Sequence, residues 1–164
     1  MARSIHFPYA LAGMSLLVAF ILNILPLPVW SQWFRPEWVV LVVLYWVIAF
    51  PEVVGIGFAW TMGLILDGLN GTVLGEHALA LLLVAFLAYA WFRQIKSFPL
   101  WQTTLLILLL IFFYKLVIWL VQGMTGQFFF SGAYGYSILT SALLWPWVDA
   151  VLTVKQSKTR LRAT

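Results

Sequence analysis

The chain lacks cysteine and has few charged residues, and each shortage excludes a class of protein. Without cysteine it has no disulfides, thiolate nucleophiles or cysteine-based metal sites, and its two histidines cannot form a metal site by themselves. Only 9% of the 164 residues are charged, against about 25% in soluble domains. Hydrophobic residues make up 64% of the chain, and the mean hydropathy is +1.02. The composition therefore predicts an integral membrane protein.

Apolar runs fill the chain and leave no room for a soluble domain. A helical span needs about 20 apolar residues, so the chain can hold about six spans. The runs are too long and uninterrupted for the strands of a membrane barrel, which alternate over about ten residues. We predict an all-α fold, a single polytopic transmembrane domain over residues 1–164. Its six predicted spans are residues 9–25, 38–50, 53–69, 78–92, 100–121 and 136–154.

The basic residues predict how this bundle is oriented. Lysine and arginine mark cytoplasmic loops, and six spans with a cytoplasmic N-terminus place seven of the nine basic residues inside. Arg35 is then the single basic residue outside, and Lys115 lies within a span. We therefore expect a multi-pass membrane protein with both termini in the cytoplasm and a basic tail at residues 155–164. Because the charge marks topology, nucleic acid is not expected as a partner. The seven inside residues are Arg3, Arg93, Lys96, Lys155, Lys158, Arg160 and Arg162.

The second predicted span is short. Residues 38–50 would extend only about 20 Å as a helix, whereas the hydrocarbon core of a bilayer is about 30 Å thick. Whether this segment crosses fully stays open.

Small residues line one face of the third predicted span. Gly55, Ala59, Gly63 and Asp67 recur every four residues and so share a helix face. Faces of this kind let helices approach closely in lipid. Two interpretations stay open: the face packs inside the bundle, or it forms a groove for a partner.

Asp67 is expected to have a partner, because a charged residue at membrane depth costs about 2.5–3.5 kcal/mol. Lys115 belongs to the same outer half of the bilayer, and its long side chain could bridge the difference in depth. We therefore predict a contact between Asp67 and Lys115. In the alternative, Asp67 caps the following turn and Lys115 extends to the interface alone.

Two further polar segments flank these spans. After Asp67 the sequence predicts a compact glycine-containing loop up to Gly75, with Gly71 suited to a positive backbone angle. Arg35-Pro36 precedes the second span, where Pro36 suits the first helical turn. Arg35 is either solvated or bound to a lipid headgroup or a partner carboxylate. The loop lacks the spacing and lysine of a phosphate loop, and no cofactor is expected.

Several of these motifs together resemble the rod shape-determining family MreD. They are Arg35-Pro36-x-Trp38, Tyr45-Trp46, Pro51 and Asp67-x-x-x-Gly71-x-x-Leu74-Gly75. The resemblance implies a non-catalytic membrane scaffold of the cell-wall elongation complex, required for rod shape. The implied partners are an MreC-like single-span periplasmic protein, the MreB filament and the RodA-type glycosyltransferase/transpeptidase pair. It also implies a fold similar to the S-components of ECF transporters.

The resemblance suggests that the small-residue face, with Asp67 and the Gly71–Gly75 loop, docks the partner. One departure is Asp149 after the Trp-Pro-Trp element, at a position where we expect the family to be apolar. The competing interpretation is a small-molecule-binding transporter component with a pocket bordered by Asp67 and Arg35. An enzyme is not expected, because no nucleophile, base and oxyanion donor can be assembled.

Overall fold

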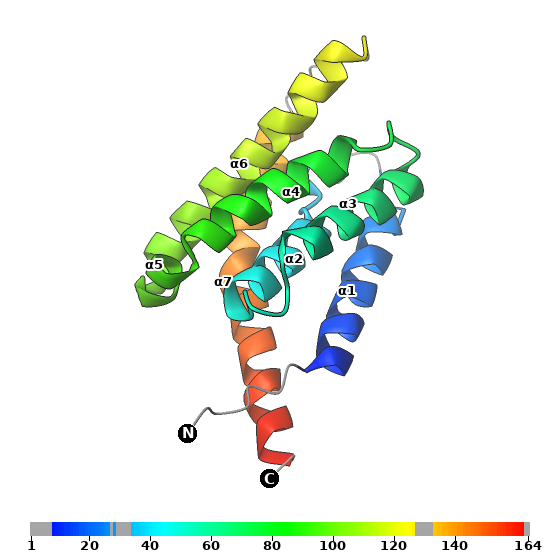
Figure 1. Ribbon diagram of the computed structural model, residues 1–164. Coiled ribbons are helices and arrows are strands. Elements are labelled where there is room, and N and C mark those ends of the chain that lie inside the picture. Colours follow the sequence, from blue (N-terminus) through cyan, green and yellow to red (C-terminus); the bar gives the residue numbers. More distant parts are fainter. Residues whose placement is uncertain (1–7, 27, 29–33, 127–132, 163–164) are drawn as a thin grey trace.

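The computed structural model describes residues 8–26, 28, 34–126 and 133–162. Within these residues the protein is built from seven α-helices and contains no strand (Figure 1). The all-α prediction is therefore confirmed for this part of the chain. The helices are α1 (Tyr9–Ile24), α2 (Trp38–Ala49), α3 (Ile56–Asn70), α4 (Glu76–Ala90), α5 (Phe92–Ser97), α6 (Leu100–Met124) and α7 (Ala133–Arg162).

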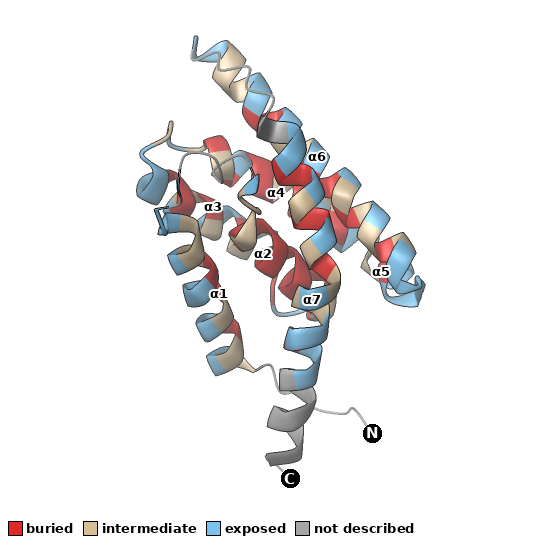
Figure 2. Cartoon of the chain, turned by 180° about the vertical axis from the view of Figure 1, so that it is seen from behind, coloured by how far each residue is buried: buried red, intermediate tan, exposed pale blue. Residues whose placement is uncertain are grey.

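Helix α2 is the core of the bundle. All ten residues from Val39 to Ile48 are buried, and α1, α3, α4, α5 and α7 each contact the helix. Figure 2 shows this buried segment between the outer helices. Its sequence has no polar face, which is the pattern expected of a fully enclosed helix. The 12 residues extend only about 18 Å, so this predicted span is a short internal helix.

Helix α6 is long and mostly apolar. Its inner face buries residues such as Ile107 and Tyr114, and its outer face exposes large apolar side chains, among them Leu105, Leu109 and Phe112. An apolar outer face is expected of a helix that contacts lipid. In the described residues, two helices are long and apolar enough to cross a membrane, Leu100–Met124 with a mean hydropathy of 2.6 and Gly135–Val154 with 1.4. Three shorter apolar helices accompany them, α1, α2 and α4.

Helices α3 and α4 form a hairpin with the largest helix–helix interface of the bundle (Figure 1). Gly63 lies where the two helices cross: a Cβ atom there would be 2.3 Å from the Cα atom of Ala78. Ala59 and Asp67, on the same face, are also buried. Of the two interpretations of the small-residue face, internal packing is therefore correct, and α4 occupies the place proposed for a partner. Gly55 precedes α3 as its N-cap and lies outside the crossing.

The structure differs from the predicted spans in two places, the segment before α6 and the end of α7. The short helix α5 lies where the sequence predicts a loop, and the ammonium of Lys96 donates a hydrogen bond to the carbonyl oxygen of Ala49 at the end of α2 (3.1 Å). A lysine at this place stabilises the C-terminal end of a helix dipole. Helix α7 continues to Arg162, so most of the predicted basic tail extends this helix.

Candidate functional site

Asp67 holds the turn between α3 and α4. Its carboxylate accepts hydrogen bonds from the backbone N–H groups of Gly75 (2.8 Å), His77 (2.8 Å) and Ala78 (3.3 Å). It also accepts hydrogen bonds from Thr72 Oγ1 (3.1 Å) and His77 Nδ1 (2.8 Å). The first backbone N–H groups of a helix have no acceptor within that helix, and the Asp67 carboxylate is the acceptor for those at the start of α4. The alternative in which Asp67 caps the following turn is thus confirmed.

Two glycines give the loop after Asp67 its shape. Gly71 ends α3 with φ 64°, and Gly75 precedes α4 with φ 102°. Both angles lie in the left-handed region, which favours glycine. The loop can therefore turn back within a few residues and present its N–H groups to Asp67.

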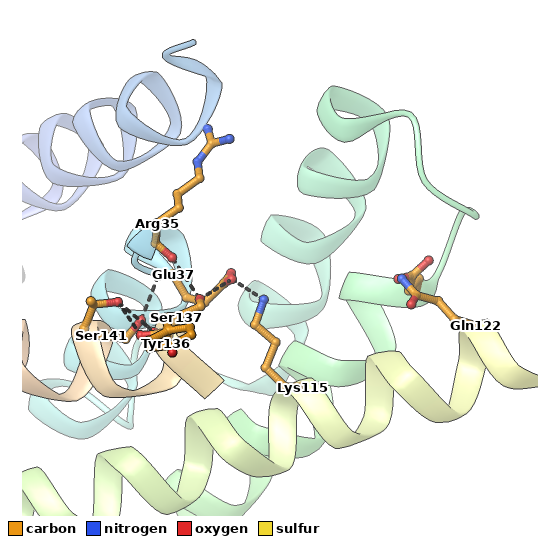
Figure 3. Close-up of polar contacts among 9 residues, drawn as sticks. Arg35, Glu37, Lys115, Gln122, Tyr136, Ser137 and Ser141 are labelled. Carbon is orange, nitrogen blue, oxygen red and sulfur yellow. Dashed lines mark hydrogen bonds and ion pairs between the residues drawn. The ribbon is translucent and has the colours of Figure 1, made fainter. Parts of the chain in front are cut away.

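Lys115 pairs with Glu37, so the predicted contact between Asp67 and Lys115 is wrong. The ammonium of Lys115 on α6 forms an ion pair and hydrogen bond with Glu37 Oε1, directly before α2 (Figure 3). Asp67 is already saturated by backbone N–H groups and His77, which removes its need for a lysine. The alternative in which Lys115 extends to the interface alone is also wrong.

Serines of α7 complete the cluster around Glu37. Ser137 Oγ donates to the carbonyl oxygen of Arg35 (2.8 Å) and lies 3.3 Å from Glu37 Oε1. The backbone N–H of Glu37 donates to Ser141 Oγ (2.9 Å). Burial alone would raise the pKa of the Glu37 carboxyl, but the Lys115 ammonium and these hydrogen bonds hold that pKa below its usual value. The cluster joins the start of α2 to α6 and α7.

Arg35 points away from this cluster, toward the end of α1 (Figure 3). Its Nε and Nη2 atoms are buried and have no hydrogen-bond partner among the described residues. Pro36 lies one residue before the N-cap Glu37, and not in the first turn of α2 as the sequence predicts.

A third polar contact joins α4 to α6. Gln122 Nε2 donates to Glu76 Oε1 (2.6 Å), and Glu76, the first residue of α4, is only 2% exposed. Glu76 therefore connects the start of α4 to α6. A carboxylate at this position also complements the positive end of the helix dipole.

An apolar groove of about 390 Å³ opens between α1 and α7. Both helices pack on α2, whose Trp38 and Val42 line the groove between them. Figure 2 shows α1 and α7 on either side of α2. Large apolar side chains on both walls remain exposed, namely Met14, Val18, Trp147 and Val151.

Comparison with known proteins identifies the family of this chain. The family described as rod shape-determining protein MreD matches residues 5–155. The chain belongs to the MreD family. The rod shape-determining protein MreD of Haemophilus influenzae is 36% identical over 144 residues, which cover 88% of this chain and 89% of that protein. No solved structure matches the chain. The resemblance inferred from the motifs is thus confirmed, and it assigns this membrane protein to the determination of cell shape.

Apart from Gly55, the N-cap of α3, the candidate residues of this MreD-family chain separate into two groups. Ala59, Gly63 and Asp67 are buried in the α3–α4 hairpin, and Gly71 and Gly75 shape its turn. Arg35 and Pro36 lie just before the start of α2. Lys115 of α6 reaches the same place through its ion pair with Glu37. Whether any of them contacts a partner stays a prediction. Within the described ranges, no group of three acidic or histidine side chains could hold a metal ion.

Sequence reasoning assigned no pairing role to Glu37, His77 or Gln122. Glu37 is an acidic residue at the same end of the bundle as Lys115, and this shared depth is the signal that could have identified the pair. His77 and Gln122 gave no comparable signal, because their partners depend on how α4 packs against α3 and α6.

Proposed function

We propose that this MreD-family protein is a non-catalytic membrane scaffold of the bacterial cell-wall elongation complex. It binds an MreC-like single-span periplasmic protein and connects it to peptidoglycan synthesis, with the MreB filament and a RodA-type glycosyltransferase/transpeptidase pair as further members. The observation that carries the proposal is the MreD match over residues 5–155, which includes α1 to α6 and most of α7. A family of shape-determining proteins does not favour the transporter alternative.

The proposed topology is multi-pass, in the inner membrane, with cytoplasmic termini. Six helices cross, α2 within the bundle, and α5, which contains Arg93 and Lys96, lies at the cytoplasmic end. Two observations support this topology: α1 begins and α7 ends on the same side of the bundle, and the basic residues follow the positive-inside rule (Figure 1). A fold similar to that of the ECF S-components is part of the proposal by analogy alone.

We place the partner's transmembrane helix in the groove between α1 and α7. Helices in lipid associate through close van der Waals packing, which a concave apolar surface favours. The exposed side chains on both groove walls support this choice. The face of α3 does not serve, because α4 covers it at Gly63.

Disulfide cross-linking tests the placement, and the natural absence of cysteine makes every introduced cysteine unique. Val18→Cys and Val151→Cys place thiols on opposite walls of the groove. Leu109→Cys is the matched control, because Leu109 is an exposed apolar residue on the outer face of α6. Each variant is expressed with single cysteines along the transmembrane segment of the MreC-like partner, and membranes are oxidised.

We expect cross-linked heterodimers from both groove positions, at partner residues that share one helix face, and none from Leu109→Cys. Cross-linking from Leu109→Cys alone would show that the partner binds to another surface of the protein. Failure of the partner to copurify with the unmodified chain would contradict the scaffold itself.

A further inference from the structure

A polar cavity lies at the end of α2 opposite Glu37. It has a volume of about 340 Å³ and is enclosed by the C-terminal part of α2, α5, the start of α6 and α7. Unlike the groove between α1 and α7, it is lined by charged and hydroxyl side chains together with apolar ones. Its polar lining includes Lys96, Thr103, Trp145, Asp149 and Thr153.

Two groups of α7 at this cavity have no partner among the described residues. The Nε1 atom of Trp145, a residue that lines the cavity, is buried without a hydrogen bond to any of them, and the residue is only 2% exposed. Asp149, four residues later on the same helix face, forms no ion pair and no side-chain hydrogen bond within the described part of the chain. A buried indole N–H requires an acceptor, and a carboxylate on an apolar helix requires a cation. A ligand that satisfies the two groups must therefore carry both a hydrogen-bond acceptor and a cation.

The opposite wall adds a positive charge. The Lys96 ammonium uses one hydrogen bond on the carbonyl oxygen of Ala49, and an ammonium has three donors, so others remain for a ligand. The hydroxyl of Thr103 lies on the same lining. Beside the cavity, Phe98 and Leu100 expose apolar side chains that acyl chains can contact.

We propose that this cavity binds the headgroup of a phospholipid that carries a phosphate and a primary ammonium, the phosphoethanolamine group. The phosphate oxygens accept hydrogen bonds from Trp145 Nε1 and Lys96, and the ammonium donates to the Asp149 carboxylate. The proposal rests on the membrane placement given above and is independent of the partner in the α1–α7 groove.

Other ligands satisfy this cavity less well. A phosphatidylglycerol headgroup has the phosphate but offers no cation to Asp149. A phosphatidylcholine headgroup is zwitterionic, yet its quaternary ammonium has no N–H to donate. A lysine side chain from a partner protein would pair with Asp149 but would leave the N–H of Trp145 without an acceptor.

Native mass spectrometry of the full-length protein tests the proposal. The protein is released from detergent with equal amounts of dioleoyl phosphatidylethanolamine, phosphatidylcholine and phosphatidylglycerol. We expect one bound phosphatidylethanolamine, retained about tenfold over the other two, since hydrogen bonds to charged groups supply a difference of this order. Asp149→Asn should abolish the preference, and Trp145→Phe should weaken it.

Two substitutions serve as matched controls. Glu52→Gln neutralises an exposed carboxylate between α2 and α3, and Trp60→Phe changes a tryptophan of α3 that is 43% exposed and lies outside the cavity and the groove. Both should keep the wild-type preference. Equal retention of the three lipids, or a preference that survives Asp149→Asn, would overturn the proposal. So would binding of free O-phosphoethanolamine without a lipid preference, or an Asp149→Asn effect confined to copurification of a protein partner.

Discussion

Gly63→Ala is the sharpest test of how α3 packs on α4. The added Cβ atom would lie 2.3 Å from the Cα atom of Ala78, 2.7 Å from its backbone nitrogen and 2.8 Å from the carbonyl oxygen of His77. Carbon atoms pack at about 3.5–4.0 Å, so the two backbones must separate by about 1.2–1.7 Å at the crossing. All three neighbouring atoms belong to the backbone, and no change of rotamer can relieve the overlap.

The expected loss of stability follows from this separation. Overpacking a filled interior costs about 1–3 kcal/mol, and separation of the helices also forfeits a quarter to a half of the dispersion energy at neighbouring contacts. We therefore expect Gly63→Ala to lower the free energy of unfolding by about 3 kcal/mol. For a chain of this length that corresponds to a fall in Tm of about 6–12 °C.

Thermal unfolding of the purified protein in mild detergent, followed by circular dichroism, measures the effect. Gly57→Ala is the matched control: Gly57 lies in the same helix, is exposed, and has no atom within 4 Å of an added Cβ. It should leave Tm unchanged or raise it slightly, because alanine is the better helix former. If Gly63→Ala unfolds at the wild-type temperature, α3 and α4 are not in close contact at this residue.

The polar contacts give two further predictions, both measured by the same thermal unfolding. Asp67→Asn removes the carboxylate that accepts hydrogen bonds from His77 Nδ1 and from the start of α4, and should cost about 1–3 kcal/mol; a wild-type Tm would show that the carboxylate is not needed there. Lys115→Met leaves the Glu37 carboxylate unpaired and should cost about 3–5 kcal/mol, most of which the added change Glu37→Gln should restore. A double variant as unstable as Lys115→Met would contradict the pairing.

Local patterns in the sequence predicted the helices and one close contact. The four-residue spacing of small residues indicated a close helix approach, and Gly63 provides it. Composition predicted an all-α membrane protein, because long apolar runs leave few other folds. The six residues of α5 escaped prediction, since a short segment with two basic residues has the composition of a loop.

Long-range pairings were not predictable in the same way. Hydropathy does not distinguish a residue that faces lipid from one that faces protein, so the apolar sequence of α2 fitted a lipid-facing span as well as an enclosed helix. The requirement that Asp67 have a partner was clear, but the choice of partner depended on tertiary packing. Glu37 and Lys115 are 78 residues apart, and only the approach of α6 to the start of α2 brings them together.

Because α2 is enclosed, the length of the protein interior does not depend on the thickness of the bilayer. The 25 residues of α6 extend about 38 Å and can adapt to a thicker or thinner membrane by tilting. Helix α2 is buried along Val39–Ile48 and keeps its length of about 18 Å. When the outer helices tilt, they remain attached to the two ends of α2. Ser141 bonds to Glu37 at one end, and Lys96 bonds to Ala49 at the other. A change in membrane thickness would therefore alter the angles of the outer helices around a core of constant length.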